Sequence, residues 1–401
     1  MSSSGSVLPA LPTVRRPGCP FDPPDGLAEL REQRPLTRMS YPDGHEGWLV
    51  TSHALARKVL ADRRFSVRPD LRHTPIPVPG MGEQARQVPP GTLTAIDPPE
   101  HTRYRRLLTG EFTVRRMRLL TAEVERITAE HLDAMDQHGP EIDLVAAFAQ
   151  PIPAQVICEL LGVPYTDRDR FQSQMLDLFH LDRTAEQRLA CYTAVHGYLG
   201  ELVQAKRAEP TDDLLSGLTT TALTDEELTN IGFMLLGAGL DTTANMISLG
   251  MFALLRNPEQ LAALRADPGI ADHAVEELLR YLPIIPFTMR AALEDVELDG
   301  QLVRAGETVT ISLPAANRDP SKYTDPDTLD LFRSTSGHLG FGHGVHQCLG
   351  QQLARVEVQV ALPALINRFP TLRLAVPADE VPLRTDMAIY GVHRLPVTWD
   401  R

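Results

Sequence analysis

One cysteine in a glycine-rich loop constrains this chain more than any other feature. Cys348 stands near the end of the stretch Phe341-Gly342-His343-Gly344-Val345-His346-Gln347-Cys348-Leu349-Gly350. Apolar side chains recur at helical spacing over residues 349–369, so a helix is predicted to begin beside the cysteine. The free N–H groups and the dipole of a helix N-terminus favour a thiolate over a thiol. Because glycines let the backbone approach a flat or bulky group, the loop predicts a thiolate that binds a shielded metal.

Three interpretations of Cys348 stay open from the residues alone. A lone cysteine is often a small buried hydrophobe. Zinc is a second interpretation, because His338, His343 and His346 are nearby, although structural zinc usually takes paired ligands such as CxxC, which the chain lacks. A third is a haem iron, since a thiolate on one face of the iron leaves the opposite face free for dioxygen.

The loop resembles the haem-thiolate loop of cytochromes P450, which reads Phe-x-x-Gly-x-x-x-Cys-x-Gly. Phe341, Gly344, Cys348 and Gly350 occupy its fixed positions. The resemblance extends over nearly the whole chain and is closest to soluble actinobacterial members of the family. It implies a mainly α fold with small β-sheets, the cytochrome P450 fold, in a single domain over residues 21–401. It also implies haem b as cofactor, with Cys348 as the axial ligand of its iron.

Composition sets the outer limits of the interpretation. The 401 residues are 43% hydrophobic, enough for a large core, and we find no apolar run long enough to span a bilayer. Residues 1–20 are Pro-rich and predict a flexible arm. Four scattered cysteines suggest no disulfide framework, which favours the cytoplasm. A net charge of −13 argues against a nucleic-acid partner, so the local basic cluster Arg103, Arg106, Arg115 and Arg116 is informative.

The longest periodic element begins at a capping box, Thr224-Asp225-Glu226-Glu227, and ends before Pro258. Its middle, residues 237–243, places glycines, an acid and threonines in an apolar helix, where each is costly. Such exceptions are expected at functional sites, although a glycine kink with a self-bonded threonine is the simpler alternative. The stretch resembles the oxygen-binding motif of cytochromes P450. That resemblance implies that Ala238 and Gly239 leave room beside the iron, and that Asp241 and Thr242 deliver protons.

Two basic side chains, His101 and Arg105, stand at i and i+4 after a helix start at residues 97–100. A solvated basic face is the common explanation, but two donors one turn apart also suit a carboxylate. The resemblance implies that this pair binds one haem propionate and that Arg290 binds the other, with His346 also in contact. It further implies that Glu277, Arg280 and Arg333 form a buried network that supports the haem loop.

Residues 66–90 carry six prolines, which preclude a long helix and predict a lid or binding loop. The lid includes Arg68, Asp70, Arg72 and His73, which suit a sugar or a carboxylate on the substrate. Helices over 167–182 and 185–209 resemble the mobile roof pair of the family. By the same resemblance, the substrate contacts are Leu235, Ala238, Ile285, Pro286, Phe287 and Ile389.

The resemblance implies a monooxygenase that inserts one oxygen atom of dioxygen into a C–H bond or across a C=C bond. The implied substrate is a bulky apolar natural product, either a macrolide or other polyketide or a terpenoid. Electrons from NAD(P)H would come through a ferredoxin reductase and an acidic ferredoxin that docks on the basic cluster, since the sequence shows no flavin or iron–sulfur domain. A cytoplasmic monomer is expected. The alternatives are a non-catalytic partner protein, a haem-thiolate sensor and an enzyme that uses peroxide.

Overall fold

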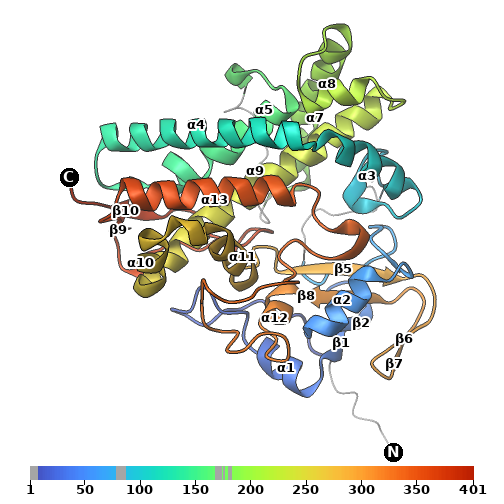
Figure 1. Cartoon of the computed structure of the whole chain (residues 1–401). Helices are drawn as coiled ribbons and strands as arrows, with labels where there is room; N and C mark the ends of the chain where they lie inside the picture. The colour runs from blue at the N-terminus through green and yellow to red at the C-terminus, as the bar shows by residue number, and fades with distance from the viewer. Residues whose placement is uncertain (1–7, 78–86, 168–173, 175–176, 179–182) are drawn as a thin grey trace, which may run out of the picture.

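The computed structural model describes residues 8–77, 87–167, 174, 177–178 and 183–401 of a mainly helical protein with small sheets (Figure 1). The helices are α1 Leu27–Gln33, α2 His53–Ala61, α3 Glu100–Glu111, α4 Val114–His138, α5 Pro151–Leu161, α7 Ala185–Ala208, α8 Leu214–Thr219, α9 Asp225–Arg256, α10 Pro258–Ala266, α11 Ala271–Tyr281, α12 Leu313–Asn317 and α13 Gln351–Arg368. The strands are β1 Leu36–Ser40, β2 Glu46–Val50, β3 Phe65–Ser66, β4 Ile142–Asp143, β5 Phe287–Ala292, β6 Val296–Leu298, β7 Gln301–Val303, β8 Thr308–Ser312, β9 Arg373–Leu374 and β10 Pro396–Thr398.

The largest sheet has the strand order β1-β2-β8-β5-β3. It joins strands from the first sixty residues to strands near residue 300, because β2 pairs with β8 in parallel, with Trp48 opposite Val309. The antiparallel pair β5 and β8 puts Arg290 opposite Val309. Successive side chains of a strand point to opposite faces, so Thr288 and Arg290 share one face of β5 while Phe287 and Met289 share the other.

Helix α9 is the centre of the helical layer and packs against α5, α7 and α13, while α13 also packs against α4 (Figure 1). Its predicted capping box is confirmed: the Glu227 N–H donates to Thr224 Oγ1 at 3.2 Å, and the Thr224 N–H donates to Glu227 Oε2 at 2.8 Å. Apolar residues around the whole circumference of α9 are buried, as expected of a helix inside a core.

The expectation that no apolar run is long enough to span a bilayer was wrong. By length and composition, α9 could cross a membrane. In the structure, 78% of its apolar window is buried inside the protein, which a core helix also shows. The window is apolar because α9 is enclosed by other helices on several sides.

Several predicted elements are confirmed, and some were missed. Helices α7, α9 and α13 begin and end within a few residues of their predicted bounds. The short helices α8, α10 and α12 were missed, since one or two helical turns give too few residues for a clear period. The predicted helix over 167–182 and the lid residues 78–86 lie largely or wholly outside the described residues.

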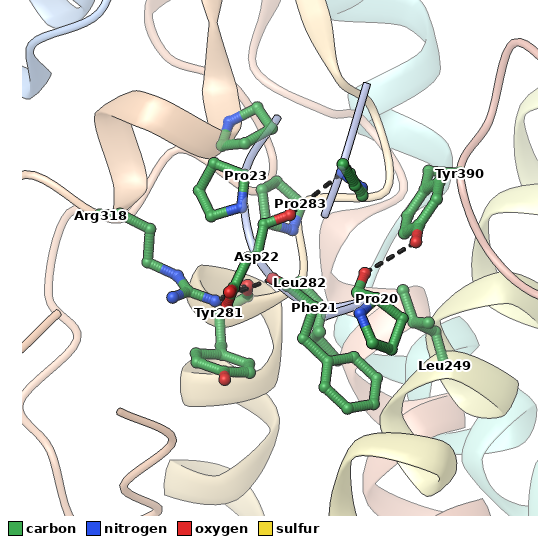
Figure 2. Close-up of a pocket in the computed structure, with 12 residues that line it drawn as sticks. Pro20, Phe21, Asp22, Pro23, Leu249, Tyr281, Leu282, Pro283, Arg318 and Tyr390 are labelled. Atoms are coloured by element: carbon green, nitrogen blue, oxygen red, sulfur yellow. Dashed lines mark hydrogen bonds between the residues drawn. The ribbon is translucent and has the colours of Figure 1, made fainter. Parts of the chain in front are cut away.

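The prediction of a flexible arm over residues 1–20 needs correction for residues 8–20. There the Ser40 N–H donates to the Pro9 carbonyl at 3.0 Å, and the Arg15 guanidinium lies 3.7 Å from the Tyr390 ring centroid. The Tyr390 hydroxyl donates to the Pro20 carbonyl at 2.7 Å, beside a small pocket of about 10 Å³ (Figure 2). Prolines exclude helix but still allow an extended chain to pack, which the composition did not reveal.

Candidate functional site

A cavity of about 440 Å³ lies between the cysteine loop, α9 and β5. All nine residues predicted to contact the cofactor line it, although they come from four separate parts of the chain. They are His101, Arg105, Ala238, Gly239, Arg290, Phe341, His346, Cys348 and Gly350. The fold therefore brings these predicted contacts to one place.

The cysteine loop is held in a fixed turn. The Cys348 N–H donates to the Phe341 carbonyl at 3.0 Å, and α13 begins at Gln351, three residues after the cysteine, as predicted. Gly344 has a φ of +77° and lies against the backbone of Leu60, where a β-carbon would collide with the Leu60 carbonyl. That glycine therefore serves packing against α2, whereas a β-carbon at Gly342 or Gly350 would meet no atom within 4 Å.

The Cys348 side chain is accessible from the cavity. Burial raises the pKa of the Cys348 thiol, and the backbone at Gly350 and the charges of Arg105 and Arg355 offset only part of that rise. The expectation that the helix N-terminus alone favours the thiolate is therefore wrong for the protein without a metal. A bound metal cation would deprotonate the thiol directly.

The zinc interpretation finds no support. Among the residues that the structure describes, no group of three or more His, Cys, Asp or Glu side chains could hold a metal ion. His338 instead bonds Glu276 through Nε2 at 2.9 Å, and the His346 ring packs on His101 with centroids 4.3 Å apart.

Basic side chains face the cavity from the lid, from α3, from β5 and from the cysteine loop: Arg72, His101, Arg105, Arg290, His343 and His346. His101 is buried, and both of its ring nitrogens lack a hydrogen-bond partner. Arg105 donates from Nη1 to the Gln347 carbonyl at 2.7 Å, which fixes α3 to the cysteine loop. Burial and the neighbouring His101, Arg290, Arg105 and Arg72 lower the pKa of His346 to about 3. A His346 ring that is neutral at pH 7, beside the guanidiniums of Arg105 and Arg290, suits a site that binds carboxylates.

Helix α9 opens onto the cavity at its small residues. Ala238, Gly239 and Thr242 line the cavity, and Ala238 is exposed to it in the middle of a core helix. The Thr242 hydroxyl donates to the Ala238 carbonyl at 2.7 Å. Since its hydrogen is used within the helix, the Thr242 oxygen keeps lone pairs to accept a hydrogen bond from the cavity.

Asp241 does not line the cavity with its neighbour Thr242. It is buried and accepts hydrogen bonds from Arg384 at 2.7 Å to Oδ1 and 3.0 Å to Oδ2. Arg384 lies 143 positions away in the chain and was not predicted from the sequence. A buried acid in an apolar helix does signal a cationic partner, but nothing local says which cation it is.

Of the six predicted substrate contacts, Leu235, Ala238 and Ile285 line the cavity, and the other three are not among its lining residues. Phe287 lies on the opposite face of β5 from Thr288 and Arg290, which do line it. Ile389 is buried, and the next residue, Tyr390, reaches the N-terminal segment instead. Pro286 is likewise outside the lining set.

The supporting network is as expected. Arg280 and Glu277 are both fully buried and share two hydrogen bonds, at 2.7 and 2.8 Å. Arg333 donates from Nε to Glu277 at 3.2 Å. The Asp330 N–H also donates to Glu277, at 3.0 Å, so the pair on α11 holds the segment that leads into the cysteine loop.

The basic cluster is largely neutralised by acids. Arg103 pairs with Glu227 at 2.8 Å, Arg115 with Asp212 at 2.8 Å, and Arg116 with Glu111 at 2.5 Å, while Arg106 is exposed. Two of these acids, Asp212 and Glu227, come from distant parts of the sequence, so the run of arginines overstated the local positive charge.

These residues fit haem. A cysteine facing the cavity from its loop suits an axial ligand, and open space at Gly342 and Gly350 suits a flat ring. The unpartnered His101 nitrogens, with Arg105 and Arg290, suit two carboxylates. Small residues on α9 leave the opposite side of the cavity open.

The comparisons with known proteins agree with this geometry. The family model described as Cytochrome P450 matches residues 39–268 and 269–393. The chain belongs to the cytochrome P450 family. It is 51% identical to Cytochrome P450 105C1 of Streptomyces sp over 94% of this chain and 96% of the relative. It is 46% identical to pentalenic acid synthase of Streptomyces avermitilis over 95% of each chain.

Solved structures give the same result. The crystal structure of CYP105P1 in complex with filipin I matches with a TM-score of 0.91 and 44% identity, over 98% of this chain and 99% of that one. This cytochrome P450 is therefore a haem-thiolate monooxygenase of the actinobacterial type. Bacterial enzymes of this type receive electrons from external redox partners, a ferredoxin and its reductase.

Glu357 on α13 was missed by the sequence analysis. It lines the cavity of the cytochrome P450, and its Oε2 is buried without a hydrogen-bond partner. Burial raises the pKa of its carboxyl to about 8, so it is largely neutral at pH 7. A helical period places position 357 on the buried face of α13, but the sequence alone gave no sign of a neutral acid there.

We expect Glu357→Gln to weaken the pH dependence of stability. A carboxyl whose folded pKa is raised stabilises the fold at low pH and loses that contribution as pH rises toward 8. Between pH 5 and pH 8 the wild type should lose roughly 3 kcal/mol relative to the Gln variant, at ~1.4 kcal/mol per pKa unit. Urea denaturation at each pH measures this. A difference that stays constant from pH 5 to pH 8 would contradict the neutral-acid assignment.

Proposed function

We propose that this cytochrome P450 hydroxylates a C–H bond or epoxidises a C=C bond of a bulky, largely apolar natural product of the polyketide or terpenoid class. The observation that carries this proposal is the cavity of about 440 Å³. Beyond the cysteine loop its walls are mainly apolar side chains from several helices and an extended segment. They include Phe112, Ile157, Leu160, Met234, Leu235, Met246, Leu282, Ile284, Ile285 and Leu313.

Relatives whose names state a product or a ligand support the substrate class. One relative is named pentalenic acid synthase, and another was crystallised with filipin I. Such analogy is weak evidence for a substrate by itself, so the lining of the cavity is the main support. A largely apolar wall binds by shape and by removal of apolar surface from water, at about 25 cal/mol per Å².

Haem, when bound, supplies the activation of dioxygen, with electron donation from the Cys348 thiolate. The chain's own residues hold it: His101, Arg105, Arg290 and His346 would take its propionates. The cavity excludes water around the substrate, and α9 supplies the groups that move protons. We infer that Thr242 accepts a hydrogen bond in the cavity and that Asp241 supplies the protons that are delivered at Thr242. Because Arg384 holds both Asp241 oxygens, this role requires the carboxylate to turn away from Arg384.

We expect Thr242→Ala to uncouple electron use from product formation. Without the Thr242 oxygen, a proton donor in the cavity loses its acceptor, so NAD(P)H consumption continues while hydrogen peroxide rises and product falls, by roughly 10-fold or more. Ser248→Ala is a matched control on α9, because the Ser248 hydroxyl also donates to the carbonyl four residues before it but Ser248 does not line the cavity. Product per NAD(P)H and peroxide are measured together, and full coupling in both Thr242→Ala and Asp241→Asn would refute the proton-delivery roles.

The substrate class is tested by titrating the ferric protein with macrolides, terpenoids, fatty acids and amino acids. A bound substrate that displaces the water on iron shifts the Soret band. We expect tight shifts with members of the bulky apolar set. Product masses one oxygen atom heavier, followed by assignment of the oxidised carbon, separate hydroxylation from epoxidation. Tight shifts with amino acids alone would overturn the proposal.

The remaining inferences concern the setting of the reaction. We infer that residues 21–401 act as one cytochrome P450 domain, as a monomer in the cytoplasm. The inferred electron donor is a ferredoxin that docks near α3, where Arg105 joins that helix to the cysteine loop. The exposed Arg106 is the residue of the basic cluster best placed to meet its acidic surface. Such attraction weakens as salt rises.

A further inference from the structure

The lid begins with four polar side chains, and the structure separates their roles. Arg68 pairs with Asp70 at 2.5 Å on the surface. His73 bonds Asp43 through Nδ1 at 2.6 Å, and its ring stacks on His45 with centroids 3.7 Å apart. The side chains of Arg68, Asp70 and His73 thus have their polar partners outside the cavity.

Arg72 is the one lid residue of the four that lines the cavity. The backbone is anchored on both sides of it: the Leu71 N–H donates to the Arg68 carbonyl at 3.2 Å, and the His73 N–H donates to Thr308 Oγ1 at 2.9 Å. Burial lowers the pKa of Arg72. Within the described part of the chain, its guanidinium has no ion pair or side-chain hydrogen bond.

The charges around the cavity leave Arg72 without a counter-charge. Arg105 and Arg290 match the two propionates of haem, and both line the cavity together with Arg72. Arg72 is close enough to Arg290 to contribute, after burial, to lowering the pKa of Arg290 to about 10. Among the described lining residues the only carboxyl is Glu357, which burial keeps protonated.

A half-buried cation without a counter-charge in a largely apolar cavity is costly, which points to a ligand anion. We propose that Arg72 is a specificity residue that binds a carboxylate carried by the apolar substrate. The planar guanidinium fork matches a carboxylate in two parallel hydrogen bonds. This inference rests on the proposed function and deepens it: the substrate is oriented by one charged group at the lid as well as by shape.

The test compares two ligands that differ only at one end. Ferric holoenzyme is titrated with dodecanoic acid and with methyl dodecanoate, and binding is read from the Soret shift. We expect the wild type to bind the acid about 10- to 100-fold more tightly than the ester, as a charge-assisted hydrogen bond provides. Arg72→Leu should remove this preference and Arg72→Lys should keep part of it. Arg68→Leu, in the same lid but paired at the surface, should keep all of it.

Three outcomes would overturn the proposal. The first is an acid-to-ester ratio in Arg72→Leu equal to that of the wild type. The second is a wild type that binds the ester as tightly as the acid, or binds neither. The third is a loss of haem content in Arg72→Leu with the acid preference intact, which would assign Arg72 to a propionate. Failure of the broader substrate proposal is distinct, since it is read from the panel of bulky ligands.

Discussion

Replacing Cys348 with serine is expected to abolish the red-shifted Soret band of the reduced carbon monoxide complex, and monooxygenase activity with it. A serine hydroxyl cannot supply the thiolate that donates electron density to iron. The basic residues and the glycine openings remain in the variant, so some haem is still expected to bind. Haem content and the carbon monoxide difference spectrum, measured on the same preparation, separate loss of the ligand from loss of the cofactor.

Cys19→Ser is the matched control, because Cys19 is a free, half-buried cysteine in the N-terminal segment and is not among the residues that line the cavity. It should keep both the normal spectrum and the activity. A thiolate spectrum in Cys348→Ser would show that another cysteine binds iron and would refute the assignment of the axial ligand.

Arg280→Met is expected to destabilise the protein by about 3–5 kcal/mol, the usual effect of removing one partner from a buried ion pair. The Arg280 guanidinium donates to both Glu277 oxygens and to the carbonyls of Asn317, Pro326 and Thr328. Its removal leaves the fully buried Glu277 with only Arg333 and one backbone N–H. Because those carbonyls precede the cysteine loop, haem content should fall together with the free energy of unfolding.

Arg126→Met on α4 is a close control for this variant. Arg126 also pairs with a glutamate three residues before it, Glu123, at 2.7 Å, but both side chains are more than 40% exposed. An exposed pair contributes ~0–1 kcal/mol, so this variant should be nearly as stable as the wild type. Equal losses of stability in the two variants would show that burial of the Glu277–Arg280 pair does not determine its contribution.

The local parts of this protein were determined by its sequence. The capping box at Thr224, the limit at Pro258 and the helix after Cys348 depend on contacts within a few residues, so their positions followed from spacing alone. The pair His101 and Arg105 is one helical turn apart, which put both on the cavity side of α3. The family motif around Cys348 then indicated haem as the cofactor, because the residues of the motif indicate the chemistry of the site as well as its backbone conformation.

Other features were decided only by tertiary structure, because they depend on residues far apart in the chain. Arg384 pairs with Asp241 across 143 positions, and two of the acids that neutralise the basic cluster come from the segment just before α8 and from α9. Pairing with β8 fixes the orientation of β5, so that Thr288 faces the cavity and Phe287 lies on the opposite face of the strand. Arg68, Arg72 and His73 looked equivalent in the sequence. Asp70 pairs with Arg68 and Asp43 pairs with His73, whereas Arg72 faces the cavity. Which charge finds a partner depends on the side chains that lie near it in space.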